Sequence, residues 1–262
     1  MNPVGARPAR ILIIAGSDSS GGAGIQADIK TAAALGAYAM TAITAITAQD
    51  TERVHAVHPV PAAIVREQML ACLNDIGADA IKTGMLGSAD VVETVAGVLA
   101  EHAKGIPLVI DPVMASTSGT AFLDEDAILA LRAHLMPLAA LVTPNDLEVR
   151  RLFLGASPTA FLIKGGHRED SRGVVDVLMH QGRQRDFVSP RIPTKNTHGT
   201  GCTLATAIAC GLGQGMALED AIVRARAYVH EAIRTAPGLG RGQGPLNHMH
   251  GLNPGKIPAE PL

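Results

Sequence analysis

Six short runs of apolar residues alternate with segments of helical periodicity along this 262-residue chain. Strands that are apolar throughout are typical of a parallel sheet with both faces covered, because neither side of the strand meets water. The alternation therefore predicts a three-layer α/β fold with a mostly parallel central sheet. We expect strands at 11–15, 38–47, 80–83, 108–110, 140–143 and 160–163, and helices near 22–35, 61–74, 88–103, 125–135, 145–153, 200–213 and 218–235.

Residues 173–188 depart from this alternation. Two short runs flank Gln181-Gly182-Arg183, which predicts a small β-hairpin at one edge of the sheet. The sequence shows no linker, repeat or low-complexity stretch, and its tail from Pro237 is rich in glycine and proline. We expect a single domain over residues 1–262, with irregular tails at 1–9 and about 251–262.

Charge and aromatic content argue against some classes of partner. A formal net charge of −2, no tryptophan and only two tyrosines are unlike a nucleic-acid surface, which needs positive charge and stacking rings. Three cysteines make no disulfide framework and fit a reducing compartment. The apolar runs are too short for a membrane span or the core of a signal peptide. We expect a soluble, cytoplasmic protein that binds neither nucleic acid nor membrane.

A polar cluster follows each predicted strand. In chain order these clusters read GSDSSGGAG, TAQD, KTGM, DPVM, TPNDLE and KGGH. The carboxyl ends of parallel strands share one edge of the sheet, where open α/β proteins bind ligands. One such cluster could be an ordinary turn, but six in succession predict a site along that edge.

The stretch NTHGTGC (196–202) precedes a helix of small apolar residues. Gly199 and Gly201, with Thr200 between them, allow a bound group to approach the backbone. Because the first helical turn has free N–H groups and the positive end of the helix dipole, the stretch predicts an anion site. The alternative is an ordinary helix start with Thr200 as its N-cap.

Cys202 would lie in the first turn of that helix, where the pKa of a thiol tends to fall. We therefore expect a partly ionised, accessible thiol with a functional role. The alternative is a small buried thiol, the common state of a free cysteine, and we expect that state for Cys72 and Cys210.

Asp111 and Glu148 are acidic residues that follow neighbouring strands. Two carboxylates beside a phosphate site suggest magnesium, which prefers few carboxylates together with phosphate oxygens and water. The alternative for Glu148 is an acid that stabilises the start of its helix. His248 and His250 form a His-x-His pair without further ligands, so we interpret them as part of a loop.

Residues 16–28 (GSDSSGGAGIQAD) form a turn that leads into a helix. The turn is not a Walker-type phosphate loop, because no Gly-Lys-Ser/Thr follows. Residues 22–27 satisfy the loose dinucleotide-binding pattern, with Asp50 downstream, but residues 17–21 separate them from the strand. We interpret the turn as a small-ligand loop, with a structural turn and a nicotinamide site as alternatives.

Taken in order, these motifs resemble the hydroxymethylpyrimidine/phosphomethylpyrimidine kinases of thiamine biosynthesis, which belong to the ribokinase-like superfamily. The resemblance runs from about Ile11 to His248 and also includes AITAITAQD and GPLNH. It implies a ribokinase-like fold, ATP as phosphoryl donor, Mg²⁺, and two successive transfers that give a pyrimidine diphosphate. We also expect a homodimer.

The resemblance also implies roles for residues at matching motif positions. Gln49 would bind the aminopyrimidine edge through paired hydrogen bonds. Cys202 stands where most relatives in the superfamily have an aspartate base, and this family has cysteine there. The pyrimidine pocket would be lined by Gly16, Ala23, Asp28, Met85 and Val113. The anion hole would be formed by Gly199, Thr200, Gly201 and Cys202. Asp111 and Glu148 would lie near magnesium, and Lys164, Gly165 and Thr197 near ATP.

The sequence departs from the family pattern in two ways. TAQD and TPNDLE place Asp50 and Asp146 where the family has uncharged residues, which adds negative charge near the site. The segment 149–163 is also some twenty residues or more shorter than in the family, which normally has a further helix there. A crossover of about a dozen residues still links parallel strands, so we expect the sheet to persist with one face less covered.

These departures leave other functions open. A pyridoxine or pyridoxal kinase is the nearest, since the superfamily includes such enzymes. A nicotinamide-dependent oxidoreductase and a catalytically silent pyrimidine-binding protein are the others, the last suggested by the short segment after Glu148. Whether Cys202 is a base or only orients the hydroxyl is left undecided by the sequence.

Overall fold

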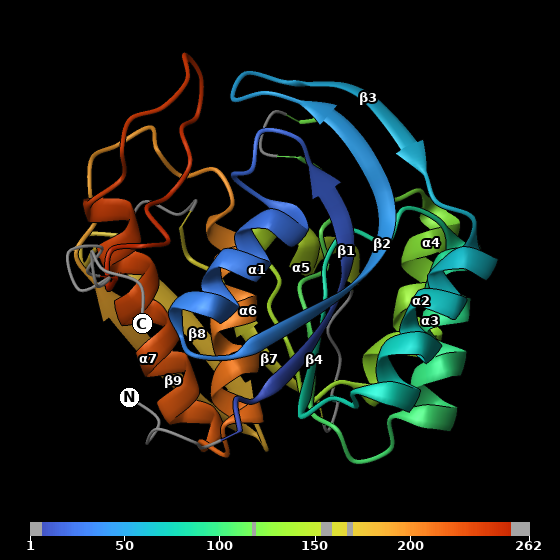
Figure 1. Cartoon of the computed structure of the whole chain (residues 1–262). Coiled ribbons are helices and arrows are strands. Elements are labelled where there is room, and N and C mark those ends of the chain that lie inside the picture. Colours follow the sequence, from blue (N-terminus) through green and yellow to red (C-terminus); the bar gives the residue numbers. More distant parts are fainter. Residues whose placement is uncertain (1–6, 117–118, 153–158, 167–169, 253–262) are drawn as a thin grey trace, which may run out of the picture.

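A computed structural model describes residues 7–116, 119–152, 159–166 and 170–252 (Figure 1). In these ranges nine strands form one sheet in the order β3-β2-β1-β4-β5-β6-β7-β8-β9. Neighbours from β2 to β7 are parallel, whereas β3 and the β8–β9 hairpin are antiparallel additions at the two edges. The strands are β1 (Arg10–Asp18), β2 (Tyr38–Gln49), β3 (Val54–Pro59), β4 (Ala80–Thr83), β5 (Leu108–Ile110), β6 (Leu141–Val142), β7 (Ala160–Ile163), β8 (Val174–His180) and β9 (Arg183–Ser189).

Helices cover both faces of the sheet (Figure 1). Along β1, Ile11 and Ile13 point into the core beneath α1, α6 and α7, while Leu12 and Ile14 point into the core beneath α2, α3 and α4. No helix in the described ranges combines the length and the apolar character needed to cross a bilayer. The helices are α1 (Gly24–Ala34), α2 (Ala62–Asp75), α3 (Ala89–His102), α4 (Glu125–Ala130), α5 (Asp146–Leu152), α6 (Thr200–Gly213) and α7 (Leu218–Arg234).

The predicted three-layer architecture and the edge hairpin are confirmed, and the sequence analysis missed one strand. Residues Val54–Pro59 form β3, which pairs antiparallel with the end of β2. Most of β3 is exposed because it lies at the sheet edge. Without a buried face it shows no apolar alternation, which is the signal that sequence analysis relies on.

The short crossover after Glu148 preserves the parallel sheet, as predicted. α5 is only seven residues long, and β7 still pairs in parallel with β6, with Leu141 opposite Ala160. Residues 153–158 of the segment 149–163 lie outside the described residues. The reduced cover of one face therefore stays a prediction.

The turn between β2 and β3 is joined to the irregular tail. The N–H of Gln243 donates to the carbonyl oxygen of Thr51 (2.8 Å), and the N–H of Gly242 donates to the Thr51 hydroxyl (3.1 Å). The N–H of His198 donates to the carbonyl oxygen of Gly244 (3.1 Å). These bonds bring the turn, the tail and the loop before α6 together near the end of β2.

Candidate active site

The start of α6 faces the ends of two strands. Its N-cap is Gly199, whose φ of 84° lies in the left-handed region that favours glycine. Thr200 is the first helical residue, and its hydroxyl donates to the Thr197 carbonyl (2.7 Å) rather than capping the helix. A Cβ placed on Gly201 would lie 3.3 Å from Lys164 Nζ and 3.4 Å from Asp111 Oδ2. The predicted anion loop therefore meets the residues that follow β5 and β7.

Asp18, at the end of β1, joins this loop to the glycine-rich loop before α1. Its carboxylate accepts hydrogen bonds from His198 Nε2 (2.8 Å) and from three backbone N–H groups of residues 20–23 (2.8–3.1 Å). A Cβ on Gly199 would overlap the carbonyl oxygen of Gly22, so the two loops are in direct contact. Burial acts to raise the pKa of Asp18, but hydrogen bonds from His198, Ser20 and Ala23 outweigh it and lower that pKa. Asp18 is therefore an ionised link between the two loops.

Lys164 is the centre of a charged cluster beside the anion loop. Its Nζ is 2.7 Å from Asp111 Oδ1 and 3.9 Å from Glu148 Oε2. The two carboxylate side chains are 2% and 8% exposed, and the lysine is 15% exposed. Burial raises the pKa of Glu148, Lys164 opposes that rise, and Asp111 adds to it. Two carboxylates share one ammonium here, so the cluster has negative charge to offer another cation.

Glu148 also begins a helix. Its Oε2 accepts the N–H of Asn145 (2.7 Å), and Asn145 Oδ1 accepts the N–H of Glu148 (3.0 Å), which is a reciprocal capping box. Glu148 therefore both caps the start of α5 and belongs to the charged cluster around Lys164. Within the described ranges, no three or more His, Cys, Asp or Glu side chains form a group that could hold a metal. A site of two carboxylates fits magnesium, which completes its shell with phosphate oxygens and water.

A second lysine lies behind Cys202 and is fully enclosed. Lys82 Nζ is 2.8 Å from Asp28 Oδ2, and both side chains are 0% exposed. The other carboxylate oxygen of Asp28 accepts the Thr206 hydroxyl (2.7 Å). Burial alone would lower the pKa of Lys82, but Asp28 and other nearby acidic groups raise it. The polar atoms of Asp28 are thus occupied within the protein, and its place in a pyrimidine pocket stays a prediction.

The expected low pKa of Cys202 is wrong. The residue lies in the first turn of α6, but burial raises the pKa of its thiol to about 11. The Lys82 ammonium pulls that pKa down, and the carboxylates of Asp28 and Asp111 push it up. Loss of water around the sulfur outweighs the helix dipole, on which the prediction depended. Cys202 is half-buried and neutral near pH 7.

Among the residues predicted to line a pyrimidine pocket, Gly16 and Met85 are in direct contact, and the others lie beside the anion loop or the charged clusters. A Cβ on Gly16 would overlap the end of the Met85 side chain, and the Thr44 hydroxyl donates to the Met85 carbonyl (2.6 Å). Ala23 packs against Gly199 in the loop contact described above. Val113 follows the charged cluster, and its N–H donates to the Asp111 carbonyl (2.8 Å). That these residues enclose one pocket stays a prediction.

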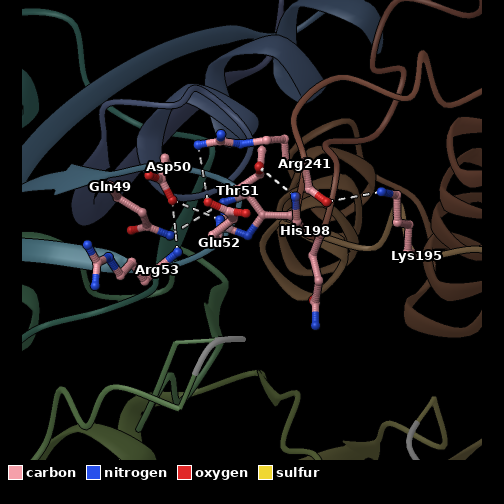
Figure 2. Close-up of a pocket in the computed structure, with 10 residues that line it drawn as sticks. Gln49, Asp50, Thr51, Glu52, Arg53, Lys195, His198 and Arg241 are labelled. Carbon is pink, nitrogen blue, oxygen red and sulfur yellow. Dashed lines mark hydrogen bonds and ion pairs between the residues drawn. The ribbon is translucent and has the colours of Figure 1, made fainter.

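Gln49, the last residue of β2, lines a cavity of about 440 Å³ between the β2–β3 turn, the loop before α6 and the tail (Figure 2). Its amide lies against His198. Asp50, the first departure from the family pattern, binds His55 (2.7 Å), which lowers its pKa, and accepts two backbone N–H groups of the turn. The extra charge at Asp50 is therefore engaged within the turn. The cavity is lined by Gln49, Asp50, Thr51, Glu52, Arg53, Lys195, His198, Arg241, Gly242 and Gln243.

Gly165 lies where β7 approaches β8. A Cβ there would overlap the Val175 carbonyl, and the Gly165 N–H donates to Asp176 Oδ1 (2.8 Å). Asp176 also forms a buried ion pair with Arg226 of α7. Glycine is therefore required for packing at this position, and contacts of Gly165 and Thr197 with ATP stay predictions.

Three further residues of the site, Asp18, Lys82 and His198, were not among those predicted from the motifs. A signal was present for Lys82, because a lysine in an apolar strand needs a buried partner. Asp18 is followed by Ser-Ser-Gly-Gly, a pattern in which an aspartate commonly accepts backbone N–H groups of its own turn. The pairing of Asp18 with His198 joins residues 180 positions apart, and no local pattern predicts it.

Sequence comparisons with known proteins agree on one family. The family profile described as phosphomethylpyrimidine kinase matches residues 18–247. A thiamine biosynthesis bifunctional protein, ThiED, of Geobacter sulfurreducens is 46% identical over 260 residues, which cover 91% of this chain and 52% of that protein. The chain therefore spans about half the length of that relative. A hydroxymethylpyrimidine/phosphomethylpyrimidine kinase of Mycobacterium bovis is 42% identical over 268 residues, covering 96% of this chain and 98% of the relative.

A solved structure extends the comparison to the fold. The ADP complex of Bacillus subtilis pyridoxal kinase has a TM-score of 0.84 and 34% sequence identity. The match covers 93% of this chain and 98% of that one. The predicted ribokinase-like fold is confirmed by this similarity.

Proposed function

The chain belongs to the phosphomethylpyrimidine kinase family, and we propose that the start of α6, Asp111 and Lys164 form its phosphoryl-transfer site. It is a phosphotransferase that uses ATP to phosphorylate hydroxymethylpyrimidine and its monophosphate for thiamine synthesis. The observation that carries this assignment is the position of Gly201, where even an added Cβ would lie against Lys164 Nζ and Asp111 Oδ2. At this position the N–H groups of the first turn of α6 and the Lys164 ammonium lie side by side. Together they can stabilise the negative charge of a phosphoryl group during transfer.

The residues of this chain would act chiefly by position and charge. Phosphoryl transfer needs alignment of the two oxygens and neutralisation of charge more than covalent chemistry. Backbone N–H groups of Gly201 and Cys202 and the Lys164 ammonium would bind the transferred group. Cys202 is neutral near pH 7, so we expect it to orient the substrate hydroxyl and not to act as a thiolate base. Lys164, Gly165 and Thr197 would lie along the nucleotide.

We also propose that Asp111 and Glu148 hold Mg²⁺ together with the ATP phosphates. Their shared negative charge and oxygen ligands suit that ion, which would neutralise phosphate charge when bound. Glu148 would keep its capping contact with Asn145 while it orients toward the ion.

The pyrimidine would lie on the β1–β2 side of the anion loop. Gln49 would bind the aminopyrimidine edge, with Gly16, Ala23, Asp28, Met85 and Val113 around the ring. A second candidate substrate is pyridoxal or pyridoxine, favoured by the similarity to a pyridoxal kinase structure. Its ring lacks the aminopyrimidine edge, so Gln49 should matter less for it.

For the whole protein we propose a single kinase domain that acts in the cytoplasm as a homodimer. The exposed edge strand β3 supports self-association, since an open edge offers unpaired backbone groups to a second chain. Sedimentation equilibrium of the purified chain would measure the oligomeric state.

A coupled ADP-release assay tests the proposed reaction with hydroxymethylpyrimidine, its monophosphate and pyridoxine as acceptors. We expect turnover of both pyrimidines and a lower kcat/KM for pyridoxine. Gln49→Ala should raise the KM of hydroxymethylpyrimidine by about tenfold, because the polar groups of the ring lose their partner. The KM for ATP should stay within about twofold, since only one substrate loses a contact. ADP release that no pyrimidine stimulates would contradict the proposed substrate.

A further inference from the structure

The amide of Gln49 lies between two polar neighbours. As placed, Oε1 is 3.2 Å from Thr47 Oγ1 and Nε2 is 3.5 Å from His198 Nε2. A half-turn about the last side-chain bond exchanges the amide oxygen and nitrogen without changing the shape. The protons on Thr47 and His198 therefore decide which atom of the amide faces which neighbour.

The His198 side of the amide requires an acceptor. His198 Nε2 lies 2.8 Å from the carboxylate of Asp18, which is ionised and can only accept a hydrogen bond. That ring nitrogen must then carry a proton. The single proton on this nitrogen points mainly to Asp18 and is shared with Gln49 over the longer distance of 3.5 Å. An amide NH₂ on this side would place a donor against that N–H, so the amide oxygen belongs here.

The Thr47 side of the amide requires a donor. The hydroxyl of Thr47 has one proton, and it lies 3.0 Å from the carbonyl oxygen of Ser17, which can only accept. The Ser17 oxygen is the nearer of the two possible acceptors, at 3.0 Å against 3.2 Å for the Gln49 amide, so the proton is assigned to Ser17. The hydroxyl oxygen then accepts from Gln49, and the NH₂ group belongs on this side. Two independent neighbours thus require the same amide orientation.

Burial makes this requirement strict. Asp18, Thr47 and His198 are only 3%, 4% and 5% exposed, so water cannot readily replace a mismatched partner. Asp18 is itself held by the backbone of its loop, which leaves His198 little freedom to turn away. Gln49 is half-buried and borders the cavity.

We infer that Thr47 and His198, anchored by Asp18, are positioning residues that fix the amide of Gln49 for recognition of an aminopyrimidine edge. With one proton given to Thr47 and one lone pair engaged by His198, the amide keeps one N–H and one lone pair. The remaining N–H can donate to a ring nitrogen, and the remaining lone pair can accept from the amine next to it. A ring with these two groups exchanged would not fit. The inference rests on the proposed function, because it explains how that site would prefer a pyrimidine over a pyridoxine ring.

The test compares KM values for two acceptors in the full chain. His198→Ala should raise the KM of hydroxymethylpyrimidine by about tenfold, because the freed amide presents mismatched groups. The kcat/KM for pyridoxine and the KM for ATP should change by less than about twofold. His198→Gln keeps an N–H that can reach Asp18 and should restore the KM to within about threefold of the parent. His55→Ala is the matched control, since His55 also binds an aspartate near the turn, Asp50.

A double-mutant cycle separates positioning from general loosening of the site. In a Gln49→Ala background, His198→Ala should raise the pyrimidine KM by less than about twofold, because there is no amide left to position. Thr47→Val, which keeps the shape of the side chain, should raise the KM in the parent and not in the Gln49→Ala background. It serves as a second probe should His198→Ala fold poorly.

The outcomes distinguish this inference from the proposed function. If the parent does not phosphorylate hydroxymethylpyrimidine, the proposed function fails and the inference fails with it. If the parent does and either variant leaves its pyrimidine KM unchanged, the inference alone fails. Equal effects of His198→Ala in the parent and Gln49→Ala backgrounds would also overturn it, because His198 would then not act through Gln49.

Discussion

Two lysine–aspartate pairs lie close to Cys202 and differ in their surroundings. Lys82 and Asp28 are 2.8 Å apart with both side chains fully enclosed. Lys164 and Asp111 are 2.7 Å apart, but Lys164 retains 15% exposure and a second carboxylate, Glu148, lies nearby. The distances are almost equal, so the distance does not tell the two pairs apart.

Charge balance and access to solvent separate their roles. The enclosed pair has one charge of each sign and a hydroxyl, Thr206, on the remaining carboxylate oxygen. It joins β4, α1 and α6 beneath the site. The open cluster has two carboxylates for one ammonium, so it can accept a further cation and a phosphate. We interpret the pair of Lys82 and Asp28 as structural support beneath the proposed pyrimidine pocket, and the cluster of Lys164, Asp111 and Glu148 as a ligand site.

The largest effect should come from Lys82→Met. It leaves Asp28 charged and unpaired in an enclosed site, which should lower the free energy of unfolding by about 3–5 kcal/mol. Urea unfolding followed by circular dichroism measures this loss. The double variant Lys82→Met with Asp28→Leu should recover most of the stability, because apolar residues of similar size need no ion partner. If Lys82→Met were as stable as the parent, the pair of Lys82 and Asp28 would have no structural role.

Lys164→Met should act mainly on catalysis. It removes a cation that would stabilise the phosphoryl group, so kcat should fall by about 10²–10³-fold. Its stability should fall less than that of Lys82→Met, because Lys164 is partly exposed and water or a cation can enter the space that its ammonium leaves beside Asp111 and Glu148. Added Mg²⁺ should raise the melting temperature of this variant more than that of Lys82→Met, in which Lys164 still neutralises part of the charge of Asp111 and Glu148. Equal losses of stability in the two variants would show that the clusters do not differ.

The thiol between the two clusters should react slowly with alkylating reagents. Burial favours the neutral form, so the thiolate of Cys202 should form only as pH rises toward its pKa of about 11. Near neutral pH its reaction with iodoacetamide should be about a hundredfold slower than that of an unfolded cysteine, whose pKa is about 8.5. Mass spectrometry of the labelled peptide follows the rate, with Cys202→Ser as background. Rapid labelling at a rate that does not change above neutral pH would show that the thiol has a low pKa, as the sequence predicted.

Glu148→Gln should give the smallest effect. It keeps the shape of the side chain and removes one charge from the open cluster, so activity at limiting Mg²⁺ should fall by about tenfold. Higher Mg²⁺ should restore part of it. Asp146→Asn changes another acid in the first turn of α5 and is the matched control. If the two variants behave alike, Glu148 serves only as a helix-start acid.

Regular features of the sequence predicted the fold well. Buried strands such as β5 and the middle of β1 are apolar in the sequence because both their faces meet helices. β3 was missed because an exposed edge strand has no such pattern. The boundaries of α6 followed from the glycines before it and the small residues within it, which are local features.

The site was predictable in its motifs and not in its electrostatics. The turn after each strand placed Gln49, Asp111, Glu148 and Lys164 at one edge, because parallel strands end together. The pKa of Cys202 was predicted in the wrong direction, since the helix start is visible in the sequence and the burial of the sulfur is not.

Local sequence patterns were enough to predict the layered α/β fold, the sheet edge at which the candidate site lies and the family to which the chain belongs. Those properties depend on local periodicity, turn chemistry and ordered motifs, all of which act over a few residues. The folded chain was needed to learn which lysine is enclosed, which is partly exposed, and that Asp18 and His198 meet across 180 positions. Burial and charge pairing depend on neighbours in space, and packing of distant segments brings those neighbours together.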